Sequence, residues 1–489
     1  MAAALSVGLF TACSSDSGSS ASSGSGSADT SAQADSQEER KDLEGVERPT
    51  SIKMMADTIM TKGNGIDDVL AKYKEITGIE LVVEKPDHDV YYETLTKAFS
   101  SGDTPDVIEI GTTYYPNFAD EGKLWDMLGA YEKSEAPVKS IIDENYIESL
   151  EIDGKLYGFP AQKGGGTVTY VRGDWMEEMG IENPKNYDEF IEMLRKFKER
   201  GEDIIPITAA GAMNSESPYN IFLREFYQDA NPDFYKNSNS GRYVDGMTQP
   251  EMKDALQRLQ DAHEEGLLDR EIVTNDTSKA RNKFFSGNVG CFNYWAGNWS
   301  VKIEEKLHKN VPEGFIKALT PIKEANYIER PSTAYSITDK AENKIGIYKF
   351  LIEFMHDGGE GQMLFTHGVE GIHWAKDGGK TVALPSRSNP DSLFDRAFFD
   401  PELSVTKFDD PISLDPRVRD SLDVLNKNST LASLPYSTNH IEDLDKVNAV
   451  KKEIVNKILL GERTVDEGIE EYKSKVGDKA EAILDTLNG

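Results

Sequence analysis

The amino-acid sequence predicts an α/β protein in which mainly parallel sheets are flanked by helices. Two observations predict this class. Short strand-like runs alternate with helical segments over residues 50–110, and a second alternating block begins after Phe159 and Pro160. Strands that alternate with helices pair in parallel, because each helix returns the chain to the edge of the sheet at which the next strand starts.

The first block contains two predicted helices and three predicted strands. Residues 67–77 carry apolar side chains on one helical face, and residues 91–101 form the second helix. Gly78 and Gly102 end these helices, because glycine readily adopts the left-handed conformation that is common after a helix. The strands are expected at 51–56, 79–84 and 106–110.

The second block has predicted strands at 167–171 and 204–208. Between them, Asn186 is expected to cap a helix, since its side chain can accept a backbone N–H of the first turn. That helix carries Phe190, Ile191, Leu194 and Phe197 at helical spacing. A long amphipathic helix near the C-terminus is marked by Val447, Val450, Ile454 and Ile458.

The charge of the chain argues against several classes of partner. Its 489 residues include 86 Asp and Glu against 54 Lys and Arg, which gives a formal net charge of -32. Such a surface repels polyphosphate, so we expect no nucleic-acid partner. It also disfavours an anionic ligand, although a local basic pocket could hold one.

Cysteine and histidine usage argues against metal and disulfide chemistry. The chain has two cysteines, Cys13 and Cys291, which excludes a disulfide framework and a cysteine-rich metal site. The seven histidines do not pair at ligand spacing on a readable helix, so we expect no metal and no cofactor. Cys291 is expected to be a small buried hydrophobe. No apolar run approaches the roughly 20 residues of a membrane span.

The N-terminus resembles the end of a bacterial lipoprotein signal. Residues 1–12 are apolar and rich in small residues, and Cys13 follows. Residues 14–49, which begin with a Ser- and Gly-rich stretch, are expected to be a flexible tether. The resemblance implies that Cys13 carries the lipid. Two features depart from it: Phe10 stands where leucine is usual, and no basic residue precedes the apolar run. We therefore expect the true precursor to start upstream of Met1; the alternative for 1–13 is a short hydrophobic strand.

Polar residues follow the first three predicted strands. In parallel sheets, ligands bind at the carboxyl ends of the strands. The plainer interpretation of each residue is an ordinary polar loop position. The candidates at these ends are Asp57 and Thr58, Asp87 and His88, and Thr112, Thr113 and Tyr114.

Five segments, in order along the chain, resemble motifs of the family 1 extracellular solute-binding proteins, the group that includes maltose-binding protein. The resemblance runs from about Ser51 to the C-terminus. Each motif is weak alone, and their shared order is the specific signal. The segments are 102–107 (GDTPDV), 152–160 (IDGKLYGFP), 170–190 (from YVRGD to DEF), 287–300 (GNVGCFNYWAGNWS) and 368–374 (GVEGIHW).

The resemblance implies a two-lobed periplasmic-binding-protein-like fold with a ligand cleft between the lobes. Lobe 1 is expected to comprise 51–162 and 328–366, and lobe 2 to comprise 163–327 and 367–489. It further implies a monomeric substrate-binding lipoprotein of an ABC importer, held on the extracellular face of the bacterial cell membrane. Such a protein captures an oligosaccharide and delivers it to the membrane permease subunits.

Aromatic side chains are the strongest candidates for a sugar site, because flat rings stack on the apolar face of a sugar. Tyr294, Trp295 and Trp299 lie in a Gly- and Asn-rich segment, and the resemblance marks Trp299 as the ligand tryptophan. A second set comprises Glu370, His373 and Trp374. Trp175 is expected mainly to pack, and Trp125 to lie in the core.

Charged and glycine-rich positions near the expected hinge have two interpretations each. Arg172 and Asp174 either pair with sugar hydroxyls or form an ordinary surface ion pair, which contributes little. The three glycines at 164–166 are not followed by Lys-Ser or Lys-Thr, so they are not a P-loop. They indicate a hinge or a close backbone approach.

Two other functions share these features. A glycoside hydrolase needs two carboxylates about 5–10 Å apart, and the many acidic residues do not exclude such a pair. A binding protein for peptides or another small solute would have the same fold and a different cleft. The aromatic segments favour the sugar-binding alternative, and we expect no enzyme activity.

Overall fold

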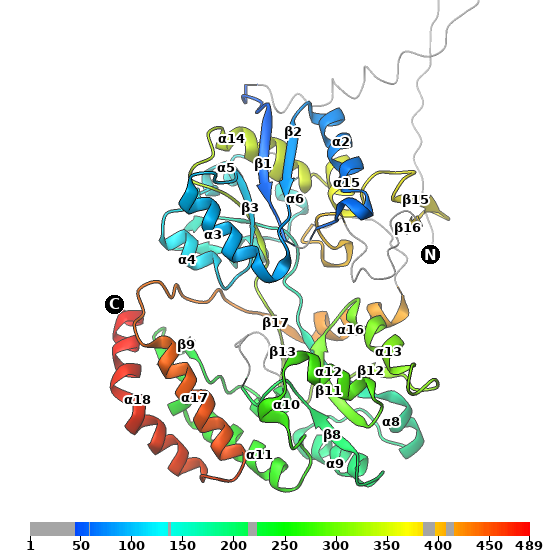
Figure 1. Ribbon diagram of the computed structural model, residues 1–489, viewed down its shortest axis with the longest axis vertical. Coiled ribbons are helices and arrows are strands. Elements are labelled where there is room, and N and C mark those ends of the chain that lie inside the picture. Colours follow the sequence, from blue (N-terminus) through cyan, green and yellow to red (C-terminus); the bar gives the residue numbers. More distant parts are fainter. Residues whose placement is uncertain (1–44, 58, 135–137, 214–222, 385–396, 407–414) are drawn as a thin grey trace, which may run out of the picture. The chain divides into compact units, whose positions relative to one another are not determined.

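The computed structural model describes residues 45–57, 59–134, 138–213, 223–384, 397–406 and 415–489 (Figure 1). The chain divides into the units Met1–Gly45 and Val46–Gly489, and every described helix and strand belongs to the second unit. Cys13 and most of the predicted tether lie outside the described residues. None of the described helices combines the length and the apolar character needed to cross a bilayer.

The first sheet confirms the predicted β-α-β-α-β order. β1 pairs in parallel with β2 and β3, whereas β14 runs antiparallel to β3 and β6. The order across the sheet is β2 (Glu80–Glu84), β1 (Ser51–Met55), β3 (Val107–Ile110), β14 (Ala334–Ile337) and β6 (Phe159–Pro160).

Helices α2 (Ile66–Thr77) and α3 (Tyr91–Ser101) connect the parallel strands of this sheet, and α2 packs beside β2 (Figure 1). Gly78 and Gly102 end them with φ angles of 74° and 83°. These angles lie in the left-handed region that glycine tolerates, as the sequence predicts.

The second sheet contains four strands. β8 runs parallel to β11, and β7 runs antiparallel to both β11 and β12. Asn186 caps α9 (Tyr187–Lys198) as predicted, since its side chain accepts the Glu189 N–H at 3.0 Å. The order across the sheet is β12 (Ile316–Ala318), β7 (Thr167–Arg172), β11 (Val289–Trp295) and β8 (Ile205–Thr208).

The reversed strands β7 and β14 each follow a segment that passes from one sheet to the other. The chain leaves β6, runs through 161–166 and enters β7; it returns from β13 (Tyr327–Glu329) through 330–333 into β14. When the chain arrives from the other sheet, the next strand begins at the edge where the other strands of its own sheet end. That strand is therefore antiparallel to them. Each sheet is therefore mainly parallel with one reversed strand.

The glycines at 164–166 lie where these two connecting segments meet. A Cβ on Gly164 would lie 1.9 Å from the Arg330 carbonyl oxygen, and a Cβ on Gly166 would lie 2.4 Å from that of Ile328. The Arg330 N–H donates to the Gly165 carbonyl at 3.0 Å. The predicted close backbone approach is confirmed, because any larger side chain would separate the two segments.

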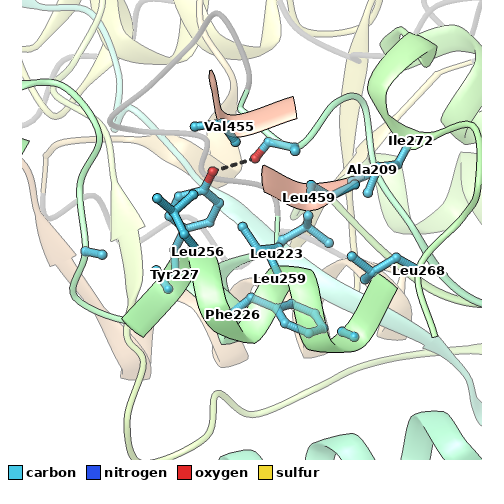
Figure 2. Close-up of a cluster of buried hydrophobic side chains, with 14 of the residues drawn as sticks. Ala209, Leu223, Phe226, Tyr227, Leu256, Leu259, Leu268, Ile272, Val455 and Leu459 are labelled. Atoms are coloured by element: carbon cyan, nitrogen blue, oxygen red, sulfur yellow. Dashed lines mark hydrogen bonds between the residues drawn. The ribbon is translucent and has the colours of Figure 1, made fainter. Parts of the chain in front are cut away.

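A large hydrophobic core lies beneath the second sheet. Figure 2 shows Leu223, Phe226 and Tyr227 converging on Leu256 and Leu459, which come from α11 (Pro250–Glu264) and α17 (Leu444–Leu459). Helical segments that are remote in sequence therefore share one core.

Two sequence predictions about single core residues are confirmed. Cys291 is fully buried in the second-sheet core, and its thiol lies 3.4 Å from the Pro206 carbonyl oxygen. Trp175 packs edge-on against Phe197, with 5.4 Å between the ring centroids. In contrast, the prediction that Trp125 lies in the core is not confirmed, because this side chain is partly exposed.

A buried ion pair joins the C-terminal helices to the hairpin β9 (Phe234–Lys236) and β10 (Tyr243–Asp245). The fully buried Lys451 ammonium on α17 lies 3.0 Å from Asp245. The Tyr472 hydroxyl, on α18 (Val465–Asn488), donates to the same carboxylate at 2.7 Å. Burial lowers the pKa of Lys451, while Asp245 opposes that change.

Residues 397–399 associate with elements of the first sheet. The Phe398 N–H donates to the Phe365 carbonyl at 2.7 Å, and the Phe398 carbonyl accepts the Tyr335 hydroxyl of β14 at 3.2 Å. The lobe boundaries, which place 367–489 in lobe 2, stay a prediction.

Candidate ligand-binding site

A cavity of about 410 Å³ is lined by residues of both sheets and of the segments that connect them. Its size lies within the range of small-molecule binding sites. Four residues predicted from the sequence line it: Asp57, His88, Trp295 and Trp299. The structure thus brings together side chains from strand ends that are more than 200 residues apart.

The wall formed by the first sheet is acidic. Asp57 follows β1 and Glu109 lies in the neighbouring strand β3, so parallel pairing brings them together at the same edge. The Asp57 backbone N–H donates to the Glu109 carboxylate at 2.8 Å. The Oδ2 atom of the Asp57 side chain lies 2.7 Å from His88 Nδ1.

Tyrosine side chains complete this wall. The Tyr92 hydroxyl accepts the Gly111 N–H at 2.8 Å, and burial raises the pKa of Tyr92 well above its ordinary value. Its ring stacks on Tyr114 with 3.6 Å between centroids. Tyr114 lies outside the lining and is 40% exposed, so the predicted candidate extends the aromatic surface beyond the cavity.

The opposite wall carries the two tryptophans. Trp295 ends β11, and Trp299 begins α13 (Trp299–Leu307). The Arg330 guanidinium lies 4.5 Å from the Trp295 ring centroid, and that of Arg281 lies 5.1 Å from the Trp299 centroid. Tyr294 packs edge-on against Trp299 behind the wall, so it supports the ring without lining the cavity.

The connecting segments and Leu403 add further lining, which the sequence interpretation missed. The Arg330 Nε–H donates to the Gly164 carbonyl at 2.7 Å. Gln162 accepts the Asp400 backbone N–H at 2.8 Å, and Leu403 adds an apolar contact surface. Gln162 lies close to the triple glycine in sequence, which was an available signal. Arg330 and Leu403 carried no such signal, because they are distant from the glycines in sequence.

The structure places the Glu370, His373 and Trp374 set outside this lining. Trp374 is only 7% exposed, and its indole N–H donates to the Gly368 carbonyl at 2.9 Å. His373 is buried and its Nδ1 accepts the Val369 N–H, while Glu370 forms a β-bridge with Trp374. A structural role accounts for these contacts, and ligand contact there stays a prediction.

Arg172, Asp174 and Asp87 also lie outside the lining. Arg172 is buried, and its guanidinium donates to Asp174 at 2.8 Å and to the Gly287 carbonyl at 2.6 Å. The same group lies over the Trp175 ring. Asp87 precedes the short helix η3 (His88–Val90) and makes no side-chain capping bond. Their contact with ligand stays a prediction.

The lining combines aromatic rings with polar side chains. Across the part of the chain that the structure describes, no group of three or more His, Cys, Asp or Glu side chains could hold a metal ion. The cavity instead opposes aromatic faces to carboxylate, phenol and amide groups.

The arrangement of two sheets, crossing segments and a shared cavity agrees with comparisons to known proteins. The sequence profile of the bacterial extracellular solute-binding proteins matches residues 57–355. The chain belongs to this family. The family resemblance seen in the sequence motifs is thereby confirmed.

Among relatives of this solute-binding protein is the polygalacturonan/rhamnogalacturonan-binding protein YtcQ of Bacillus subtilis. It is 22% identical over 442 residues, which cover 84% of this chain and 86% of that protein. The fructooligosaccharide ABC transporter substrate-binding protein FusA of Streptococcus pneumoniae is 24% identical over 252 residues, covering 47% of this chain and 46% of FusA.

Solved structures confirm the two-lobed fold. The N-glycan transport solute-binding protein NgtS of Streptococcus pneumoniae superposes with a TM-score of 0.65 and 17% identity, covering 90% of this chain and 98% of NgtS. The alginate-binding protein AlgQ2 superposes with a TM-score of 0.59 and 20% identity, covering 91% of this chain and 98% of AlgQ2.

Proposed function

We propose that this chain is the substrate-binding lipoprotein of an ABC importer and that it captures an oligosaccharide in the cavity between its two sheets. Family membership supports a solute-binding role, and the relatives with the ligands named above bind oligosaccharides or polysaccharides.

The observation that carries the proposal is the opposition of two tryptophans to a polar wall. Trp295 and Trp299 offer apolar ring surface, whereas Asp57, Glu109 and Gln162 offer planar polar groups. A sugar ring has an apolar C–H face and a polar rim of hydroxyls. A cavity with both kinds of wall can therefore bind both parts of the sugar at once.

Ligand binding closes the two lobes in this mechanism. A sugar that touches both walls binds the closed arrangement more tightly, so it shifts the population toward that arrangement. The glycines at 164–166 let the connecting segments pass close together at the point where such a motion needs a hinge. The closed protein then delivers its ligand to the permease subunits in the membrane.

The location of the protein follows from the same role. We place a lipid on Cys13, with residues 14–49 as the tether that lets a monomeric binding protein reach its permease on the extracellular face of the membrane. Replacing Cys13 by Ser should release the protein from membranes of the producing bacterium into the medium. Retention of Cys13→Ser with the membrane fraction would contradict lipid attachment at that residue.

A thermal-shift screen over plant and host oligosaccharides, followed by titration calorimetry on each hit, tests the proposed ligand class. At least one oligosaccharide should raise the melting temperature and give saturable binding. A set of oligopeptides in the same screen tests the alternative class of solute. Peptide hits without sugar hits would overturn the proposal.

The hydrolase alternative is tested on the same hits. Among the described residues, the carboxylates that line the cavity are those of Asp57 and Glu109. Both also have structural contacts, since Glu109 accepts the Asp57 backbone N–H and the Asp57 carboxylate contacts His88. Prolonged incubation of the protein with a bound oligosaccharide should leave the chain length unchanged by mass spectrometry. Shorter products that disappear in Glu109→Gln would assign an enzyme activity.

A further inference from the structure

The negative charge in the cavity lining affects which oligosaccharides the cavity can bind. Two carboxylates, those of Asp57 and Glu109, line the cavity on the first-sheet wall, with the Asp57 side chain 13% exposed and Glu109 6% exposed. Largely buried charges are weakly screened by solvent, so they act strongly on a ligand in the cavity.

The neighbouring tyrosines report the same negative field. Burial raises the pKa of Tyr91 well above its ordinary value, and the negative charge of Glu109 is the next cause, with Asp57 a smaller one. The Tyr91 hydroxyl donates to the carbonyl oxygens of Met55 and Glu109, so it stays protonated beside the two acids.

The permanent positive charge in the described lining is that of Arg330, and two contacts hold its guanidinium against the protein. Its Nε–H donates to the Gly164 carbonyl at 2.7 Å, and the guanidinium lies over the Trp295 ring at 4.5 Å. Arg281 lies over Trp299 and Tyr294 outside the lining. Among the described lining residues, His88 is the other basic side chain, and it contacts Asp57.

We infer that the cavity selects neutral oligosaccharides and rejects those built from uronic acids. This inference rests on the proposed function and narrows its substrate class. Hydroxyl groups donate hydrogen bonds to carboxylates, whereas a uronate carboxylate can only accept and is repelled by Asp57 and Glu109. The net charge of -32 opposes the approach of the same anions.

Such a preference for neutral ligands would distinguish this chain from relatives whose named ligands are acidic polysaccharides. The names of YtcQ and AlgQ2 specify polygalacturonan and alginate, which are polymers of uronic acids. Identities of 22% and 20% leave room for a different ligand charge in the same fold. Specificity of this kind is set by the groups in the cleft, and an unpaired or repelled charge is an effective means of rejection.

Matched trisaccharides test the inference on the unmodified protein at pH 7.5. The neutral probes are β-1,4-mannotriose, galactotriose, maltotriose, cellotriose, xylotriose and kestose. The acidic probes are the β-1,4-mannuronate and α-1,4-galacturonate trimers. Titration calorimetry should find at least one neutral probe bound at least ten-fold more tightly than either acidic probe. Raising NaCl from 50 to 500 mM should narrow that ratio only slightly, because salt screens the long-range repulsion by the net charge of -32 and acts little on the two buried carboxylates.

The variant Glu109→Gln removes one charge and keeps the shape of the side chain. The ratio of the mannuronate Kd to the best neutral Kd should fall at least five-fold in this variant. Glu481→Gln is the matched control, because Glu481 is exposed on α18, outside the cavity, and should leave the ratio unchanged. Asp57→Asn provides the second test at the other carboxylate, so a folding defect in one variant does not decide the result.

The outcomes separate this inference from the proposed function. A uronate trimer that binds as tightly as the best neutral probe, or more tightly, would overturn the inference and leave oligosaccharide binding in place. Binding by none of the eight probes, together with a negative screen over longer neutral and acidic oligosaccharides, would remove both. An unchanged ratio in both Glu109→Gln and Asp57→Asn would also overturn the assigned role of the acidic wall.

Discussion

At the scale of single residues, two tryptophans with similar surroundings in sequence have opposite roles. Trp299 lines the cavity and rests on Tyr294 and Arg281, whereas Trp175 is buried against Phe197. Arg281 lies over the Trp299 ring, whereas both Arg172 and Arg200 lie over the Trp175 ring. The two residues differ in burial, because Trp299 borders the cavity and Trp175 is 4% exposed.

Trp299→Ala should weaken binding of the best oligosaccharide by about 1–3 kcal/mol, if sugar stacking is comparable to base stacking on aromatic rings. The melting temperature should change little, because this ring faces the cavity. Titration calorimetry and a melting curve give both quantities. Trp175→Ala is the matched control and should lower the free energy of unfolding by about 3–5 kcal/mol. Unchanged affinity in Trp299→Ala would remove this ring from the site.

His356 gives the fold a pH dependence of known sign. It is buried between Phe159 and Phe399, and burial lowers its pKa to about 4. An unfolded histidine titrates near 6.5. Between these values the unfolded chain binds a proton that the folded protein does not bind, so the free energy of unfolding falls as the pH falls.

The variant His356→Leu should lose that part of the pH dependence. In the wild type, His356 should lower the free energy of unfolding by about 3 kcal/mol between pH 7 and pH 4. Urea unfolding of both proteins at several pH values measures the difference between their slopes. His440→Leu, at an exposed histidine, should keep the wild-type slope. Equal slopes in wild type and His356→Leu would contradict the prediction.

At the scale of elements, the connecting segments and the C-terminal helices each depend on one close contact. Glycine is required at 164, where the backbone approaches Arg330, and at 166, where it approaches Ile328 of β13. Helices α17 and α18 are joined to the hairpin β9–β10 through Lys451, Tyr472 and Asp245. Both contacts join parts of the chain that are remote in sequence.

Gly164→Ala should destabilise the protein and weaken ligand binding together. The new Cβ would meet the Arg330 carbonyl at 1.9 Å, so the two connecting segments must separate. We expect a loss of about 1–3 kcal/mol in the free energy of unfolding. Gly129→Ala is the control, because a Cβ there meets nothing within 4 Å in helix α5 (Leu128–Glu132) and should be neutral or slightly stabilising. Similar unfolding energies for the two variants would contradict the steric argument.

Lys451→Met should cost about 3–5 kcal/mol in the free energy of unfolding, because it leaves the buried Asp245 carboxylate without its cation. Urea denaturation measures this cost. Lys452→Met changes the adjacent exposed lysine and should stay within about 0.5 kcal/mol of the wild type. If both variants unfold alike, the buried pair contributes no stability of its own.

At the scale of the whole molecule, the proposed mechanism predicts closure on binding. A ligand that contacts Trp295 on one wall and Glu109 on the other should bring the lobes together. Small-angle scattering should therefore give a smaller radius of gyration at saturating oligosaccharide. An oligosaccharide that the protein does not bind serves as the control. A bound protein with an unchanged radius would contradict closure.

Local patterns in the sequence predict the family and part of the secondary structure. The predicted strands, the caps at Gly78, Gly102 and Asn186, and the close approach at 164–166 all depend on neighbours in the chain or on the absence of a side chain. Five ordered motifs were enough to indicate the family, because each motif is a short segment at a turn or at the end of a strand.

Which side chains line the cavity depends on contacts between segments that are distant in sequence. Glu109 and Arg330 line it although neither stood out in the sequence, whereas Trp374 and Arg172 stood out and are buried in contacts of their own. The physical reason is that periodicity fixes which face of an element a side chain occupies, and that packing between distant segments decides whether the face meets a cavity or the core.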